Sequence, residues 1–156
     1  MKDLSSAIAE GLVDRYEVFA RRVRALADKL TEEQFWTKPY PYGNSFGNLV
    51  LHLTGNLSYY IGARIANTGY VREREREFTE SGARPKDEVL RALDAAVDVV
   101  VKALRSETEQ SWQEDYSAEG LDGACARFDA YLRCATHFHL HIGQMTYLVK
   151  ALGGES

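Results

Sequence analysis

The sequence lacks the features that would tie it to a membrane, a secretory route or nucleic acid. No run approaches the ~18 consecutive apolar residues of a bilayer-spanning helix. The N-terminal stretch MKDLSSAIAEGLVDRYEVFA interrupts its apolar residues with acids, so it has no signal-peptide core. Lysine and arginine number 19 against 23 acids, giving a net charge of −4 with no basic cluster. We therefore expect a soluble protein whose partners include neither a membrane nor nucleic acid.

Cysteine is also scarce, with Cys125 and Cys134 as the only two. Nine residues apart on one helix, they would point to opposite sides, which excludes a local disulfide or a shared metal. This favours a reducing, cytoplasmic setting. A chain of 156 residues buries enough surface to fold without a disulfide or structural metal. We expect one domain over residues 1–156.

Several catalytic signatures are missing as well. No Ser-His-Asp or Cys-His spacing stands out, and no Gly-rich phosphate loop follows a strand. The Glu-x-x-His motif of ferritin-like di-iron sites is absent. Acyl transfer, nucleotide chemistry and di-iron chemistry are therefore disfavoured.

What the sequence does contain is apolar residues at three- and four-residue spacing, typical of helices with one buried face. These stripes predict helices over about 4–30, 46–65, 85–106 and 124–151. Asn44 or Ser45 is placed to cap the second helix, and Asn67 and Gly69 to end it. Four amphipathic helices without a convincing strand predict an all-α four-helix bundle. The uneven connections leave open an up-down-up-down order and an order with a crossover.

The histidines are the sharpest chemical signal. Three of the four lie within CATHFHLHIGQ, residues 134–144, and the fourth is His52 in GNLVLHLTGNL. His137 and His141 differ by about 40° and one turn on a helix, within reach of one metal ion, whereas His139 points about 200° from His137. With His52 they make three neutral nitrogen donors, typical of a catalytic zinc site. The alternative is that these histidines are hydrogen-bonded core residues.

Two polar side chains accompany these histidines. Asn56 follows His52 by four residues, and Gln144 follows His141 by three. Each is placed to orient a ligand or reach a bound molecule, since outer hydrogen-bond partners fix metal-binding imidazoles. A polar bundle residue is the alternative for Gln144.

The remaining notable residues favour structural roles. Gly47 and Gly55 are expected to be packing positions that let helices approach closely. Arg72, Arg74 and Arg76 belong to YVREREREFTESGARP, which alternates in charge. We interpret them as a solvated charge run in an ordered connection, in preference to a substrate clamp.

Three segments resemble a known family: NSFGNLVLHLTGNLSYYIG, REREREF and HFHLHIGQMTYL. They are similar to the DinB-like superfamily of four-helix-bundle proteins, and most closely to its DUF1572-type branch of small bacterial proteins. His137, His141, Gly143 and Gln144 complete the pattern His-x-x-x-His-x-Gly-Gln. The resemblance implies a divalent transition metal, nickel or zinc, held by His52, His137 and His141.

The resemblance also implies a reaction class. Relatives include bacillithiol S-transferases and mycothiol-dependent maleylpyruvate isomerase, and others are labelled metal-dependent hydrolases. We expect a thiol-dependent S-transferase that acts on a small electrophilic substrate through a metal-activated thiolate, because no acid or base for water is identifiable. A metal-dependent hydrolase and a non-catalytic metal-binding stress protein are the alternatives. No catalytic residue is assigned, and a homodimer is left open.

Overall fold

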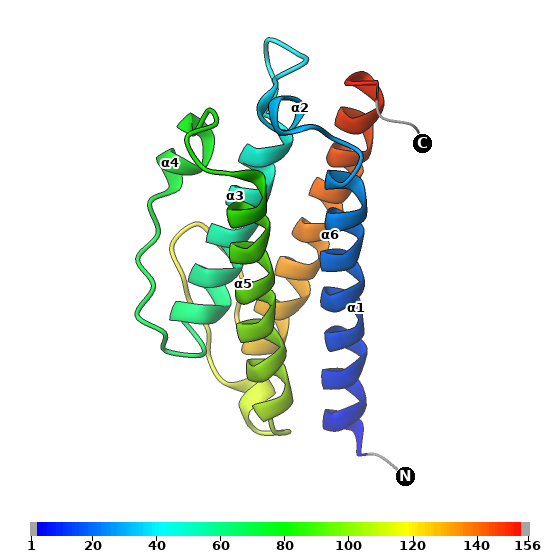
Figure 1. The fold of residues 1–156 in the computed structure, drawn as a ribbon. Helices are drawn as coiled ribbons and strands as arrows, with labels where there is room; N and C mark the ends of the chain where they lie inside the picture. The colour runs from blue at the N-terminus through cyan, green and yellow to red at the C-terminus, as the bar shows by residue number, and fades with distance from the viewer. Residues whose placement is uncertain (1–2, 154–156) are drawn as a thin grey trace.

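In the computed structural model, which describes residues 3–153, four long helices lie side by side as a bundle (Figure 1). These are α1 (Leu4–Ala27), α3 (Phe46–Leu57), α5 (Lys86–Ser106) and α6 (Arg127–Ala151). A π-helical segment, η1 (Ser58–Ala63), continues α3. Residues 3–153 contain no strand, only an isolated bridge between Asp115 and Ala126. The predicted all-α four-helix bundle is confirmed.

The bundle has a crossover topology. Helix α1 packs against α5 and α6, and α3 packs against the same two helices. Figure 1 shows α1 and α6 running upward and α3 and α5 running downward. Because α3 and α5 are parallel, the chain between them returns along the whole bundle. This decides between the two orders that the sequence leaves open.

The helix boundaries follow local capping chemistry. Ser45 is the N-cap of α3: its side chain accepts from the Asn48 backbone N–H, and Asn48 reaches back to the Ser45 backbone. After η1, Asn67 and Gly69 adopt positive φ angles of 54° and 76°. Helix α6 begins three residues later than predicted. Cys125 therefore lies in a loop and not on a shared helix with Cys134, although both are free thiols.

Two short helices occupy segments that were predicted to be connections. Helix α2 (Glu32–Trp36) begins with a capping box formed by Thr31 and Gln34. It packs Trp36 against Gly47 of α3, where an added Cβ would lie 2.6 Å from the indole ring. Gly47 is thus a packing position, as expected.

The second, α4 (Arg74–Thr79), lies within the alternating charges. The prediction of a solvated charge run was wrong for part of this segment, because Glu77 is 6% exposed and pairs with Arg72. Arg76 remains exposed and pairs with Glu73. Among residues 3–153, no helix has the length and apolar character needed to cross a bilayer.

Candidate metal centre

Three histidines from two helices converge in the bundle. His52 comes from α3, and His137 and His141 come from α6. Their Nε2 atoms meet: His52 and His137 are 3.1 Å apart, and His137 and His141 are 3.0 Å apart. One ring nitrogen from each lies within 4.8 Å of the other two. The structure thus brings together the three residues that the sequence analysis grouped.

His139 lies apart from this cluster. It is exposed on α6, and its ring stacks on Phe19 of α1 at a centroid distance of 5.2 Å and an interplanar angle of 7°. The helical spacing accounts for the difference, since residues 137 and 141 share a face that residue 139 does not.

Hydrogen bonds to residues outside the cluster orient two of the three imidazole rings. The His52 Nδ1–H donates to Glu77 Oε2 at 2.8 Å, and the His141 Nδ1–H donates to Gln144 Oε1 at 2.7 Å. Both partners are oxygen acceptors, so the proton of each neutral ring is on Nδ1. The Nε2 lone pairs of His52 and His141 therefore point into the cluster. Carboxylate–histidine pairs of this kind orient metal ligands.

Glu77 is itself held in place by α3 and by Arg72. Arg72 donates from Nε to Glu77 Oε1 at 2.7 Å and from Nη2 to Oε2 at 2.9 Å. The carboxylate lies against Gly55, where an added Cβ would be only 2.1 Å from Oε1. Burial acts to raise the pKa of Glu77, but hydrogen bonds from His52 and Arg72 bring the pKa below its ordinary value. Glu77 is therefore an ionised partner for His52.

This arrangement corrects two sequence interpretations. The outer partner of His52 is Glu77, and within residues 3–153 no hydrogen bond joins His52 to Asn56. Arg72 belongs to the buried site and not to a solvated run. The sequence signal for Glu77 was weak, because it is one of three glutamates in REREREF and only the contact with Gly55 distinguishes it. Gln144 does contact a histidine, as its spacing suggests.

The two imidazoles of α6 are kept neutral. Burial, together with the neighbouring His141 and His52, lowers the pKa of His137 to about 3. Burial also lowers the pKa of His141, although the Gln144 hydrogen bond acts in the opposite direction. Imidazole nitrogens from three histidines are a donor set that zinc and nickel accept. The residues present therefore fit a divalent transition metal.

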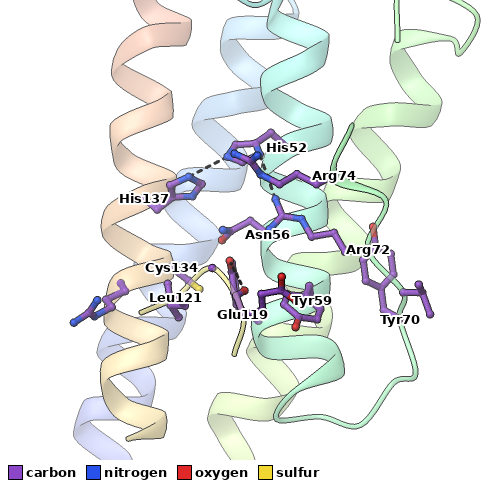
Figure 2. Close-up of a pocket in the computed structure, with 14 residues that line it drawn as sticks. His52, Asn56, Tyr59, Tyr70, Arg72, Arg74, Glu119, Leu121, Cys134 and His137 are labelled. Carbon is purple, nitrogen blue, oxygen red and sulfur yellow. Dashed lines mark hydrogen bonds between the residues drawn. The ribbon is translucent and has the colours of Figure 1, made fainter. Parts of the chain in front are cut away.

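A cavity of about 750 Å³ opens beside the cluster (Figure 2). Its lining includes His52 and His137, and Figure 2 shows them at one end, with Glu119 and Leu121 of the α5–α6 loop at the other. Aromatic walls come from Tyr59, Tyr60 and Tyr70. The first two belong to η1, and π-helical turns are frequent at functional sites.

The far wall of the cavity is a loop fastened through its main chain. The carbonyls of Ser117, Glu119, Asp122 and Gly123 accept hydrogen bonds from side chains of the bundle. The donors are Arg64, Tyr60 and Arg133. The loop also packs apolar side chains against the core, among them Tyr116, Leu121 and Ala124.

Cys134 also lines the cavity but is unsuited to act as a nucleophile. The thiol is 1% exposed, and burial raises its pKa to about 12. At neutral pH it is therefore protonated, and the thiolate is the reactive form.

Comparison with known proteins places the chain in a family. Residues 7–156 match the model of the family described as "Protein of unknown function (DUF1572)". No protein of curated function matches the sequence.

Two solved structures share the fold. One is a conserved protein from Enterococcus faecalis, at 17% identity and a TM-score of 0.74, covering 99% of this chain and 100% of that one. The other is YfiT from Bacillus subtilis, described as a probable metal-dependent hydrolase with an unusual four-helix bundle topology. It has 17% identity and a TM-score of 0.76, with 99% of this chain and 93% of YfiT covered. The chain therefore belongs to the DUF1572 family.

Proposed function

We propose that the protein is a divalent-metal-dependent enzyme that acts on a small molecule, with His52, His137 and His141 as its metal ligands. The observation that carries this proposal is the convergence of three Nε2 atoms beside a cavity of about 750 Å³. Three neutral nitrogens with an open position are the donor set of catalytic zinc sites. When bound, the metal supplies Lewis acidity that lowers the pKa of a thiol or a water molecule.

The reaction that we propose is thiol-dependent S-transfer to a small electrophile. Among the described residues that hydrogen-bond to the three histidines, none is a free base or nucleophile. Both Glu77 oxygens are occupied by His52 and Arg72, and the Cys134 thiol is protonated. A nucleophile brought in by a low-molecular-weight thiol removes this need. The thiol sulfur forms a bond to the electrophilic carbon, the bond to the leaving group breaks, and the thiol proton passes to solvent.

Hydrolysis is the second candidate, and the fold shared with YfiT supports it, since that protein is described as a probable metal-dependent hydrolase. A metal-binding stress protein without turnover is the third. All three candidates use the same histidines, and they differ in what enters the cavity.

Elemental analysis of the purified protein tests the shared part of the proposal. We expect about one zinc or nickel ion per chain, because one cluster of three nitrogens is present. A protein that contains no such metal and takes up neither ion on dialysis would contradict all three candidates.

Cobalt substitution then separates them. If a thiol binds at the centre, adding glutathione, L-cysteine or bacillithiol produces a sulfur-to-cobalt charge-transfer band, and the protein transfers the thiol to monochlorobimane with release of chloride. Cobalt spectra that do not respond to any thiol would favour hydrolysis. A thiol-responsive spectrum without turnover of any electrophile would favour the non-catalytic alternative.

A further inference from the structure

Two buried polar atoms at the candidate metal centre have no hydrogen-bond partner. They are His137 Nδ1 and Asn56 Oδ1, and the only other such atom in the described part of the chain is Trp36 Nε1 on α2. Both residues line the same cavity, from facing helices. Figure 2 shows Asn56 projecting from α3 toward α6, the helix that carries His137. Buried polar groups are nearly always paired, so two such exceptions in one cavity require an explanation.

The position of the ring protons explains why His137 lacks a partner. His52 and His141 carry their protons on Nδ1, bound to Glu77 and Gln144. Their Nε2 atoms therefore present lone pairs to His137 Nε2 at 3.1 and 3.0 Å. A hydrogen atom is needed between these nitrogens, and His137 Nε2 carries it. His137 Nδ1 is then unprotonated and can only accept a hydrogen bond.

Binding a metal changes the hydrogen-bond partner that the His137 ring requires. To give its Nε2 lone pair to a cation, the neutral ring must carry its proton on Nδ1 instead. That Nδ1–H then requires a buried acceptor. Asn56 Oδ1, on a side chain only 5% exposed, is an acceptor without a donor. Its amide turns about a terminal torsion that is broad and soft, so the oxygen can change direction without a change of rotamer at the Cβ atom.

We propose that Asn56 is the positioning residue for His137, accepting the hydrogen bond from His137 Nδ1–H when the centre holds a metal. The inference rests on the proposed metal centre and deepens it. Each of the three imidazoles then has one oxygen acceptor: Glu77 for His52, Gln144 for His141 and Asn56 for His137. Metal binding moves the His137 proton from Nε2 to Nδ1 without changing the charge of the ring.

Zinc affinity, measured by competition with a chromophoric chelator, provides the first test. Asn56→Leu keeps the size of the side chain but removes the acceptor, and we expect zinc affinity to fall about 10- to 100-fold. Asn56→Asp keeps an oxygen at the same place and should bind zinc close to the parent value. The matched control is Thr54→Val on the same helix, because the Thr54 hydroxyl bonds only to the Val50 carbonyl.

The tautomer of His137 provides the second test, because Asn56 can accept a hydrogen bond from this ring only if the Nδ1 atom carries the proton. Long-range ¹H–¹⁵N correlation of the ring should show the proton on Nε2 in chelator-treated parent protein and on Nδ1 after zinc is added. This measurement uses the parent protein, so a zinc-loaded ring without a proton on Nδ1 would overturn the role of Asn56 even if Asn56→Leu fails to fold. Thermal melts by circular dichroism check the folding of each variant.

The outcomes separate this inference from the proposed function. If the parent binds neither zinc nor nickel, both are overturned. If the parent binds zinc but Asn56→Leu binds it equally well, or if the zinc-loaded His137 ring has no proton on Nδ1, the role of Asn56 is overturned and the metal centre stands.

Discussion

The two sides of the candidate centre hold their histidines in contrasting ways. On the α3 side, His52 is 7% exposed and donates to the buried, ionised Glu77, which in turn is paired with Arg72. On the α6 side, half-buried His141 donates to the neutral amide of the exposed Gln144. The two hydrogen bonds are almost equal in length, at 2.8 and 2.7 Å.

The difference lies in access to water. A buried carboxylate needs a cation and a full set of hydrogen bonds, whereas an exposed amide leaves its remaining groups to solvent. The α3 side is therefore part of the core, and its loss should destabilise the protein. The α6 side orients a ring and should contribute little to the free energy of unfolding.

Among the changes predicted here, Glu77→Ala should cause the largest loss in the free energy of unfolding. It leaves the buried Arg72 guanidinium without its partner and the His52 Nδ1–H without an acceptor. Breaking one member of a buried ion pair costs about 3–5 kcal/mol, which urea unfolding of the protein with chelator present would measure. Glu77→Gln, which keeps an oxygen acceptor, should lose less. A stability loss below that of a surface substitution would show that the α3 side is not part of the core.

Lowering the pH should cause the next largest loss in the free energy of unfolding. The pKa of His137 is lowered to about 3, so unfolded chains take up its proton near pH 6.5 while folded chains do not. The free energy of unfolding, measured with chelator present, should therefore fall as the pH drops below about 6.5. Glu77, whose pKa lies below the ordinary value of a glutamate, adds a further loss only in more acidic solution.

The interval from about pH 6.5 to about pH 5 consequently reports on His137 and His141, whose pKa values are lowered by burial. His137→Leu should flatten the dependence of the urea midpoint on pH in this interval, whereas Glu77→Gln should not. An equally steep dependence in His137→Leu would assign the effect to another group.

The sequence predicted the helical side of the centre better than the side built by the connection. Periodicity places His137 and His141 on one face, and helical geometry then separates His139 from them. Ser45 could be identified as a cap from its own chemistry. The role of Glu77 depends on a tertiary contact with Gly55, which no local pattern contains.

The same reasoning explains the other differences. The Thr31–Gln34 capping box of α2 is visible in the sequence, but a five-residue helix has no periodicity to support it. The start of α6 was predicted too early because Ala124 continues the apolar stripe while the backbone there is still a loop. The crossover order depends on how α1 and α3 both pack against α5 and α6, and this is decided by the assembled core.

Gln144→Leu tests the α6 side of the candidate centre. Removing an outer partner should lower zinc affinity by about tenfold at most, since the ring remains on its helix. The free energy of unfolding should stay within about 0.5 kcal/mol of the parent value, as for other exposed positions. Chelator competition and urea unfolding would measure the two quantities. A stability loss as large as that of Glu77→Ala would remove the contrast between the two sides.

His139→Ala should have the smallest effect. The substitution removes a stacked contact with Phe19, which at an exposed position is worth about 0.5 kcal/mol, and zinc affinity should not change. His137→Ala on the same helix is the matched comparison and should abolish binding. If His139→Ala weakened zinc binding as much, α6 would have to present a different face to α3.

The loop over the cavity is held largely through hydrogen bonds to its main chain, and this determines which of its residues can be exchanged. The hydrogen bonds from Tyr60, Arg64 and Arg133 end on carbonyls of this loop, so they survive exchange of the side chains at those positions. Tyr116 is different, because its hydroxyl donates to the Tyr60 carbonyl. Gly120 is an exception, because its φ is 83° and an added Cβ would lie 2.6 Å from the Tyr60 hydroxyl. Leu121 packs against the core, whereas Glu119, which also lines the cavity, is exposed. A substitution at position 119 can therefore change the lining of the cavity while the histidines, their partners and the bundle stay unchanged.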